Sequence, residues 1–213
     1  MSNIPISEVF YTLQWEWRNT GKPVIFIRFW WCNKRCNFCD TPYAVTDNSE
    51  MKQEDLFSII DEIDKYPSKH IVFTWWEPAL FEKQIAEIQN YLSANRYWYT
   101  WEIETNGSIE LKNYYDQVNV SYKTSNSWVP KYELKALSTK YDYKFVVADE
   151  YDFEEVEEII EEYNLPKENI WLMPLWVTED SQKNLLVAKY CMEKWYRYCQ
   201  RTHILLFGNK RWV

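Results

Sequence analysis

The sequence predicts an α/β fold with mostly parallel strands, arranged as an open or partial (β/α) barrel. Apolar segments rich in β-forming residues alternate with longer segments of helical periodicity, which is the pattern of βα units. Six or seven such units fit into the chain, and a closed eightfold barrel typically needs about 250 residues. We therefore expect a modified barrel that does not close.

Each expected strand is a short apolar run. The strands are predicted at 24–29, 70–74, 99–104, 117–121, 143–147 and 170–173, with a last one near 198–203. Helices are predicted at 53–65, 80–94, 153–163 and 179–193, where apolar residues recur at three- and four-residue spacing. The acidic run at 149–162 is interpreted as a solvated helix face. In such folds a ligand site lies at the carboxyl ends of the strands.

Composition limits the classes of protein that the chain can be. The 213 residues carry 24 Lys and Arg against 32 Asp and Glu, a net charge of −8, which disfavours a nucleic-acid partner. No apolar run approaches the roughly 20 residues that span a bilayer, and the start lacks a signal-peptide pattern. We expect one domain over residues 1–213, cytoplasmic, with a small-molecule substrate and no contact with membranes.

Three of the five cysteines are crowded into one loop after the first strong strand. Cys32, Cys36 and Cys39 form a C-x3-C-x2-C pattern. Thiolates are the ligands of iron–sulfur clusters, and three of them would leave one iron open for a substrate. A zinc knuckle or buried free thiols are the alternatives. Cys191 and Cys199 are interpreted as ordinary small apolar residues.

Several further motifs strengthen the cluster interpretation. Phe38 precedes the last cysteine of the loop, as in the radical S-adenosylmethionine (SAM) motif, and Arg28 lies just before the loop. Residues 8–17 (EVFYTLQWEW) resemble the pattern E-I-F-x-S/T-L-Q-G-E-G, and residues 39–43 (CDTPY) resemble C-D-T-x-Y. Residues 74–78 (TWWEP), 104–107 (ETNG) and 121–123 (SYK) resemble T-G-G-E-P, E-T-N-G and S-P-K. On these motifs the chain resembles the 7-carboxy-7-deazaguanine synthase family of the radical SAM superfamily, from residue 8 to residue 209.

The resemblance implies a specific reaction. Such lyases cleave S-adenosylmethionine reductively to a radical that acts on 6-carboxy-5,6,7,8-tetrahydropterin. Ring contraction and loss of ammonia then give 7-carboxy-7-deazaguanine, in queuosine and 7-deazapurine biosynthesis. The resemblance also implies a [4Fe-4S] cluster, Mg²⁺, a flavodoxin-like electron donor and a homodimer.

The resemblance also assigns site residues. It places Cys32, Cys36 and Cys39 on the cluster and Thr41 on Mg²⁺. The residues expected to border the cofactor are Phe38, Cys39, Asp40, Trp75, Trp76, Glu77, Ser121 and Lys123. Those expected to meet the substrate are Leu13, Gln14, Trp15, Glu16, Arg28, Thr74 and His203, with Arg28 suited to bind a carboxylate as a fork. Arg28 could instead form a surface ion pair, Ser121 cap a strand and Lys123 be a solvated charge. His70 is interpreted as structural.

Tryptophan stands where the family pattern has or would have glycine. The chain has 13 Trp and 3 Gly, whereas average usage would give about 15 Gly. The tryptophans at such positions are Trp15, Trp17, Trp30, Trp31, Trp75, Trp76, Trp128, Trp176, Trp195 and Trp212. Trp98, Trp101 and Trp171 are expected to pack in strands or the core. We favour an altered version of a family member over positions that simply tolerate indole.

Two other functions stay open. One is a radical SAM activating enzyme that acts on a partner protein. The other is a catalytically impaired scaffold, because indoles at Trp75 and Trp76 would compete with the cofactor.

Overall fold

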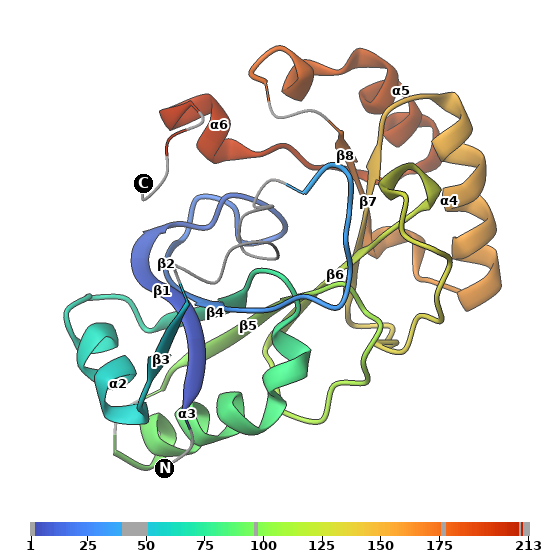
Figure 1. The fold of residues 1–213 in the computed structure, drawn as a ribbon. Coiled ribbons are helices and arrows are strands. Elements are labelled where there is room, and N and C mark those ends of the chain that lie inside the picture. Colours follow the sequence, from blue (N-terminus) through green and yellow to red (C-terminus); the bar gives the residue numbers. More distant parts are fainter. Residues whose placement is uncertain (1–2, 40–50, 96–97, 176–177, 209, 211–213) are drawn as a thin grey trace.

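The structure is a computed structural model that describes residues 3–39, 51–95, 98–175, 178–208 and 210. Within these residues, nine strands form one sheet in the order β3-β1-β2-β4-β5-β6-β7-β8-β9 (Figure 1). Strand β1 pairs antiparallel with β2 and with β3, and each neighbouring pair from β2 to β9 is parallel. The two edge strands, β3 and β9, do not pair with each other, so the predicted open α/β architecture is confirmed.

The element bounds follow the predicted rhythm closely. The strands are β1 (Ile4–Leu13), β2 (Pro23–Phe29), β3 (Lys52–Glu54), β4 (His70–Thr74), β5 (Thr100–Thr105), β6 (Gln117–Tyr122), β7 (Asp142–Val147), β8 (Ile170–Pro174) and β9 (Arg197–Tyr198). The α-helices are α2 (Leu56–Asp64), α3 (Glu82–Asn95), α4 (Glu150–Tyr163), α5 (Leu185–Lys194) and α6 (Thr202–Phe207). Short 3₁₀ turns are η2 (Pro78–Phe81), η3 (Ser125–Ser127), η4 (Lys167–Asn169) and η5 (Ser181–Lys183).

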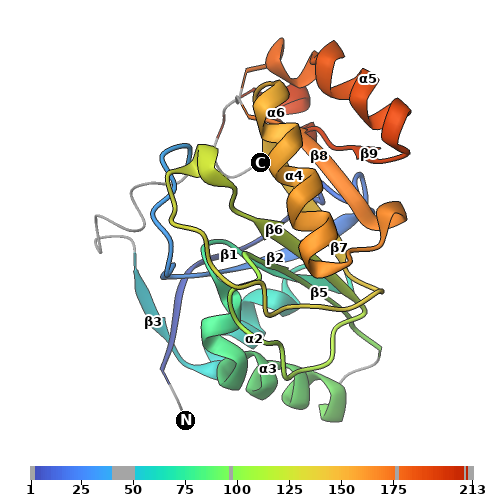
Figure 2. The ribbon, with the colours of Figure 1, turned by 90° about the vertical axis from the view of Figure 1, so that its right-hand side faces the viewer.

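Strand alternation divides the sheet into two unlike faces. Successive side chains of a strand point to opposite faces. On one face, apolar residues such as Ile27 of β2, Phe73 of β4 and Phe145 of β7 join a single core with the buried residues of α2, α3, α4 and α5. Figures 1 and 2 show these four helices along the same side of the sheet.

The other face, called the inner face below, carries polar and charged side chains. Its members include Arg28, Thr74, Glu102, Glu104, Asn119 and Lys144, most of them buried. Parallel strands usually present apolar side chains on both faces, because both faces are normally covered. A row of charges on the inner face therefore indicates a site rather than a second core.

Local signals explain where the helices begin and end. The carboxylate of Asp55 accepts hydrogen bonds from two amides of the first turn of α2, and that of Asp149 accepts one from the Tyr151 amide at the start of α4. The side chain of Asn184 caps α5. Helix α4 ends at Asn164 and α5 ends at Trp195, and both of these residues have a left-handed backbone.

Three expectations about the elements are wrong. Strands β1 and β3 were not predicted, because β1 contains charged Glu8 and β3 is three polar residues long. The strand expected near 198–203 is the two-residue β9, and α6 begins at Thr202. The helix expected at 179–193 starts six residues later, since Asn184 supplies its cap. No helix in the described part of the chain is long and apolar enough to cross a membrane.

Candidate active site

Gln14 lies at the centre of the polar inner face. It directly follows β1, and its side chain is almost fully buried. Its Nε2 donates to Glu102 Oε1 at 2.7 Å and to Glu104 Oε1 at 3.2 Å. Its Oε1 accepts from the backbone amides of Trp15 at 2.8 Å and Glu16 at 3.4 Å. All of these bonds are internal, so the Gln14 side chain fixes the β1–β2 loop onto the sheet.

Glu102 is the buried hub beneath Gln14. Besides Gln14, Glu102 accepts hydrogen bonds from Asn19 Nδ2 at 2.8 Å and Asn119 Nδ2 at 2.6 Å. His70 Nε2 lies 2.8 Å from the second carboxylate oxygen of Glu102, consistent with the structural role expected for this histidine. A fully buried carboxylate is stable only when its oxygens are paired, and four partners meet that requirement here.

Glu104 reaches further toward the carboxyl edge of β5. Thr74 donates its hydroxyl to Glu104, which joins the predicted substrate contact on β4 to the E-T-N-G segment. Burial raises the pKa of Glu104 to about 7, and the negative charge of Glu16 adds to this rise, while the Thr74 hydrogen bond opposes it. Glu104 can therefore hold or release a proton near neutral pH.

Glu16 joins the β1–β2 loop to the far side of the sheet. Its carboxylate forms an ion pair with Lys144 of β7, and Arg201 Nε lies 3.7 Å from it. Although burial opposes ionisation, the charges of Lys144 and Arg201 leave the pKa of Glu16 lower than usual. The guanidinium of Arg18, in the same loop, donates two hydrogen bonds of 2.7 and 3.1 Å to the carboxylate of the buried Asp142. The loop thus bridges the inner face from β1 to β7.

Arg28 is fully enclosed. It lies opposite Glu8 in the β1–β2 register and forms a buried ion pair with it, so it is not the surface pair weighed as the alternative. The guanidinium carbon lies 4.2 Å from the centre of the Phe10 ring and 3.3 Å from the Trp75 ring. Aromatic rings therefore cover the cation that was expected to receive a substrate carboxylate.

Trp15 and His203 lie next to this stack. Their ring centroids are 4.4 Å apart, and the Arg28 guanidinium carbon is 5.4 Å from the Trp15 ring. The amide of Thr202 donates to the carbonyl of Trp15 at 3.0 Å, which brings α6 onto the inner face. Leu13, the last residue of β1, pairs with Pro23. The structure therefore gathers most of the expected substrate residues in one place.

The cysteine loop lies at the carboxyl edge of the sheet, as predicted. Cys32 is buried, and Cys36 and Cys39 are partly exposed. Asn33 pairs with Asn106 after β5 at 2.9 Å, and the Asn37 amide donates to the carbonyl of Ser127 at 3.0 Å. No three His, Cys, Asp or Glu side chains within the described ranges already surround one metal position. The donor set is nevertheless that of a three-thiolate cluster site.

Two ionisable residues, Glu77 and Lys123, interact electrostatically with Cys32 of this loop. Glu77 is completely buried and accepts hydrogen bonds from Thr105 Oγ1 at 2.6 Å and the Asn106 amide at 2.7 Å. Burial raises the pKa of Glu77 to about 7, against these hydrogen bonds and the charge of Lys123. Lys123 donates to Ser121 at 2.7 Å, so it is not a free solvated charge. Burial also raises the pKa of Cys32 to about 11, which means that a bound cation is needed to hold its thiolate.

The remaining predicted residues lie elsewhere or outside the described ranges. Phe38 packs against a second apolar cluster that contains Trp17 and Met173. Cys199 belongs to that cluster and Cys191 to the main core, as expected for small apolar residues. Asp40 and Thr41 fall outside the described residues.

The tryptophans have an unusual backbone. Seven of them have a positive φ: Trp17 (68°), Trp31 (144°), Trp75 (66°), Trp76 (51°), Trp98 (26°), Trp128 (60°) and Trp195 (64°). Asn164 is the one other non-glycine residue with a positive φ in the part of the chain that the structure describes. A left-handed conformation costs a residue with a side chain about 1–2 kcal/mol, and glycine pays none of this.

This pattern tests the sequence-based assignment of the tryptophans. Trp15 and Trp30, expected at glycine positions, do not have a positive φ, and Trp176 and Trp212 fall outside the described residues. Trp101 and Trp171 are buried as expected, but the expectation for Trp98 is wrong. Trp98 is 91% exposed, has a positive φ and lies two residues before β5, so it packs in neither strand nor core.

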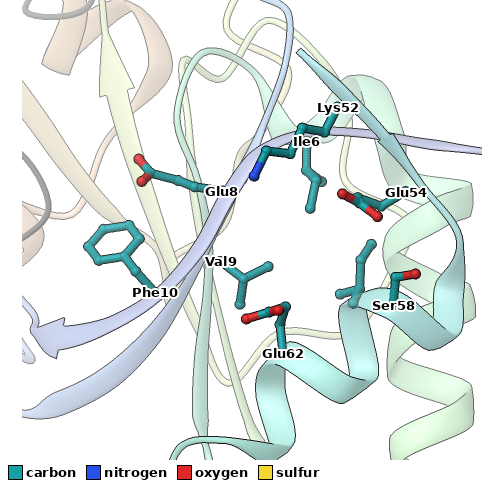
Figure 3. A pocket seen from close by; sticks show the side chains of 9 residues that line it. Ile6, Glu8, Val9, Phe10, Lys52, Glu54, Ser58 and Glu62 are labelled. Carbon is teal, nitrogen blue, oxygen red and sulfur yellow. The ribbon is translucent and has the colours of Figure 1, made fainter. Parts of the chain in front are cut away.

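A pocket of about 280 Å³ lies between β1, β3 and α2 (Figure 3). Figure 3 shows Glu54, Ser58 and Glu62 around it, with Val9 on the α2 side of β1. No residue predicted to hold cofactor or substrate lines this pocket, but Glu8 and Phe10, which contact Arg28, do. The pocket therefore borders the Arg28 site without containing a predicted ligand residue.

Comparison with known proteins connects this geometry to a family. The Radical SAM superfamily profile matches residues 27–181, which include the cysteine loop and the strands from β4 to β8. The 7-carboxy-7-deazaguanine synthase of Halobacterium salinarum is 32% identical, over 97% of this chain and 91% of its own. The chain belongs to the 7-carboxy-7-deazaguanine synthase family.

Further members of the synthase family agree. The enzyme of Pyrobaculum aerophilum is 31% identical over 98% of this chain and 96% of its own. The crystal structure of QueE from Escherichia coli superposes with a TM-score of 0.73 at 25% identity, covering 94% of this chain and 95% of that one. The radical SAM fold predicted from the motifs is therefore confirmed. A [4Fe-4S] cluster and S-adenosylmethionine are the cofactors of this family.

The two cofactors fit this chain unequally. The three thiols of the cysteine loop are the donor set that a cluster requires. The methionine end of S-adenosylmethionine is expected at positions 75–77, where the Trp75 and Trp76 rings stack at 5.5 Å. The indoles therefore occupy the space in which that ligand was expected, and the residues present do not fit it.

Sequence reasoning missed the residues that support this synthase site. Glu8 and Glu102 were not singled out as site residues, nor were Lys144 and Arg201. Tyr132, whose hydroxyl donates to the Asn106 carbonyl at 2.8 Å and accepts from the Lys123 amide at 3.0 Å, was also missed. Charged residues in an otherwise apolar strand were the available signal for Glu102 and Lys144. Glu8 carried the same signal, but β1 was not recognised as a strand.

Proposed function

We propose that this fold serves the conversion of 6-carboxy-5,6,7,8-tetrahydropterin to 7-carboxy-7-deazaguanine, as a radical SAM lyase of the queuosine and 7-deazapurine route. The observation that carries the proposal is the junction of the T-W-W-E turn with the cysteine loop. The Glu77 amide donates to the Trp31 carbonyl at 3.2 Å, and Glu77 accepts from Thr105 and Asn106 of the E-T-N-G segment. Three family motifs thus meet at one edge of the sheet.

The chain's own residues would divide the work. Cys32, Cys36 and Cys39 would hold the cluster, which would supply an electron when bound. Arg28 is the cation placed to receive a substrate carboxylate once its aromatic cover opens. Glu104 would hold a proton near the pterin ring of the substrate, because a pKa of about 7 lets this carboxyl gain or lose a proton at neutral pH.

The finer assignments belong to the same proposal. Thr41 would bind Mg²⁺ together with the substrate, and Asp40, Ser121 and Lys123 would border the cofactor. A flavodoxin-like protein would donate the electron, and the enzyme would act as a cytoplasmic homodimer of one domain over residues 1–213. Support for these assignments comes from the motif resemblance and from membership of the synthase family.

A second candidate function has a specific observation in its favour. The Trp75 ring lies 3.3 Å from the Arg28 guanidinium carbon, which fits a scaffold that keeps the fold and the cysteine loop but excludes ligands. The activating-enzyme alternative has no comparable support, because the relatives over nearly the whole chain carry the synthase name.

Anaerobic reconstitution separates these candidates. We expect about four irons per chain and a reduced-state paramagnetic resonance signal. A signal that changes when S-adenosylmethionine is added would favour the lyase, and turnover of the pterin would then be measured. A signal that ignores the cofactor would favour the scaffold.

The matched variants are Cys36→Ala, in the loop, and Cys191→Ala, in the helix-side core. Only the loop variant should lose iron. No iron in the parent chain, or equal loss in both variants, would contradict a cluster in this loop.

A further inference from the structure

The positive-φ tryptophans are the wrong residue type for their backbone. Only a few per cent of non-glycine residues have φ above zero, and Asn, Asp and His are several-fold enriched among them. Here seven of the eight such residues described are tryptophan, while all three glycines also have a positive φ. Tryptophan and glycine therefore share one backbone conformation in this chain, although their side chains have nothing in common.

The surroundings of these tryptophans do not explain the conformation. Trp98, Trp128 and Trp195 are 91%, 80% and 87% exposed, so no packing of the indole holds the backbone there. Trp195 follows the last turn of α5 with φ 64° and ψ 32°, and the amide of Tyr196 donates to Cys191 at 3.0 Å. Such a helix end usually carries glycine.

We infer that the seven positive-φ tryptophans stand at glycine positions, and that the protein made in its own cell carries glycine at them. A single cause accounts for the whole set, namely one codon that the standard-type translation gives as tryptophan and that the cell translates as glycine. The standard code has one tryptophan codon, UGG, so a separate codon for these positions would be the reassignable stop codon UGA. UGA differs from the glycine codon GGA at one base.

Glycine in place of tryptophan has its largest consequence at positions 75 and 76, next to the expected ligand site. This part of the inference rests on the proposed function. Phe10, Arg28, Trp75, Trp76 and Trp30 form one continuous stack, in which Trp76 meets Trp30 edge-on at 4.9 Å. Glycine at positions 75 and 76 removes the two middle rings of this stack. The face of the Arg28 guanidinium then opens toward the cysteine loop, and backbone amides can approach a ligand there.

The first test reads the residue directly. Peptides from the protein purified from its own cells are analysed by mass spectrometry, and the codons of the gene are read. We expect glycine masses at all seven positions, and one codon there that Trp101 and Trp171 do not use. Tryptophan masses at Trp75 and Trp76 would overturn the inference.

The second test needs no knowledge of the source. Trp195→Gly is compared with Trp195→Ala, so that loss of the indole cancels and only the backbone preference remains. We expect Tm to be about 2–4 °C higher for glycine, because alanine pays for the left-handed conformation.

Tyr151 provides the control for this comparison. It is an 82% exposed aromatic residue in the first turn of α4, where alanine should be the more stable of the two replacements. Alanine more stable than glycine at Trp195, and again at Trp128, would contradict the glycine assignment.

The third test addresses the site. The parent, the W75G/W76G double variant and the control W98G are reconstituted with iron, and binding of S-adenosylmethionine is measured by equilibrium dialysis. We expect at least a tenfold gain in affinity for the double variant and none for W98G. An iron-loaded double variant that binds no better than the parent would refute the occluding role, whereas failure of all three chains to load iron would count against the proposed function instead.

Discussion

Gln14 and Glu102 lie 88 residues apart in the chain, and a hydrogen bond of 2.7 Å joins Gln14 Nε2 to Glu102 Oε1. The other end of the same amide, Gln14 Oε1, accepts the backbone amide of Trp15 at 2.8 Å. The loop that carries the expected substrate contacts is therefore positioned from the middle of the sheet. Gln14 was predicted to face the substrate, but its side-chain amide forms this internal bridge instead.

Glu102→Gln should destabilise the protein strongly, because it places an amide donor where Gln14, Asn19 and Asn119 already donate. Leaving one or more buried donors unpaired costs about 1–3 kcal/mol each. We expect the free energy of unfolding in urea to fall by about 3 kcal/mol. The exposed Glu168→Gln is the matched control and should change it by less than about 0.5 kcal/mol. An E102Q protein as stable as the control would show that the hub does not hold the loop.

Glu104 should make stability depend on pH. Its pKa is about 7 in the folded protein against 4.5 for an ordinary glutamate, so the folded state binds more protons than the unfolded state between these values. Stability should therefore fall as pH rises from about 4.5 to 7 and then level off. The full effect is on the order of 3 kcal/mol for this one group.

Glu104→Gln removes that titration, while Glu77, whose pKa is also raised to about 7, still titrates. We expect the decrease in unfolding free energy between pH 5 and pH 7.5 to become smaller in E104Q, without vanishing. Chemical denaturation at the two pH values measures it. Parallel pH profiles for parent and variant would rule out Glu104 as the source.

Gly107 should tolerate no side chain. Its φ is 79°, and a Cβ there would lie 2.5 Å from Leu134 Cδ1 and 2.7 Å from Val120 Cγ1. Gly107→Ala should destabilise by about 2–4 kcal/mol, which combines overpacking with the left-handed conformation. Gly21, with φ 85° and nothing within 4 Å of such a Cβ, is the matched control. Gly21→Ala should cost only about 1 kcal/mol, and equal urea midpoints for the two variants would contradict the packing argument.

The sequence predicted the sheet better than it predicted the site. Apolar periodicity located β2, β4, β5, β6, β7 and β8 within one residue at each end, since each is a largely buried run between clear breaks. It missed β1, whose charged Glu8 pairs across the sheet with Arg28. Such long-range partners are invisible in a single sequence.

The motifs located the site, but they did not define the partners. The cysteine loop and the T-W-W-E turn were correctly placed at one edge of the sheet, because strand ends meet there. The ring cover over Arg28 and the Gln14–Glu102 bridge depend on three-dimensional packing of segments far apart in sequence. The positive φ of Trp98 was also not evident from the sequence, because backbone dihedral angles are known only from the structure.

The contact between Lys34 and Tyr132 should stabilise the cysteine loop measurably. Lys34 Nζ lies 3.5 Å from the centre of the Tyr132 ring, and Tyr132 donates its hydroxyl to the Asn106 carbonyl at 2.8 Å. A cation over an aromatic face contributes about 0.5–1 kcal/mol at partly exposed sites. A double-mutant cycle of Lys34→Met and Tyr132→Leu, measured by urea unfolding, should give a coupling energy in this range.

Lys69 and Tyr99 provide the comparison, because their cation-to-ring distance is 4.9 Å and Lys69 is exposed. Lys69 Nζ also donates to the Tyr99 hydroxyl at 3.1 Å, so this cycle is run in a Tyr99→Phe background that removes the hydrogen bond. Their cycle should give a smaller coupling energy, since water screens an exposed charge. If the coupling of Lys34 to Tyr132 does not exceed that of the surface pair, the ring does not anchor the loop. The loop would then depend on its other contacts, the 2.9 Å bond between Asn33 and Asn106 and the 3.0 Å bond from the Asn37 amide to the Ser127 carbonyl, and Asn33→Ala would be the side-chain variant that weakens them.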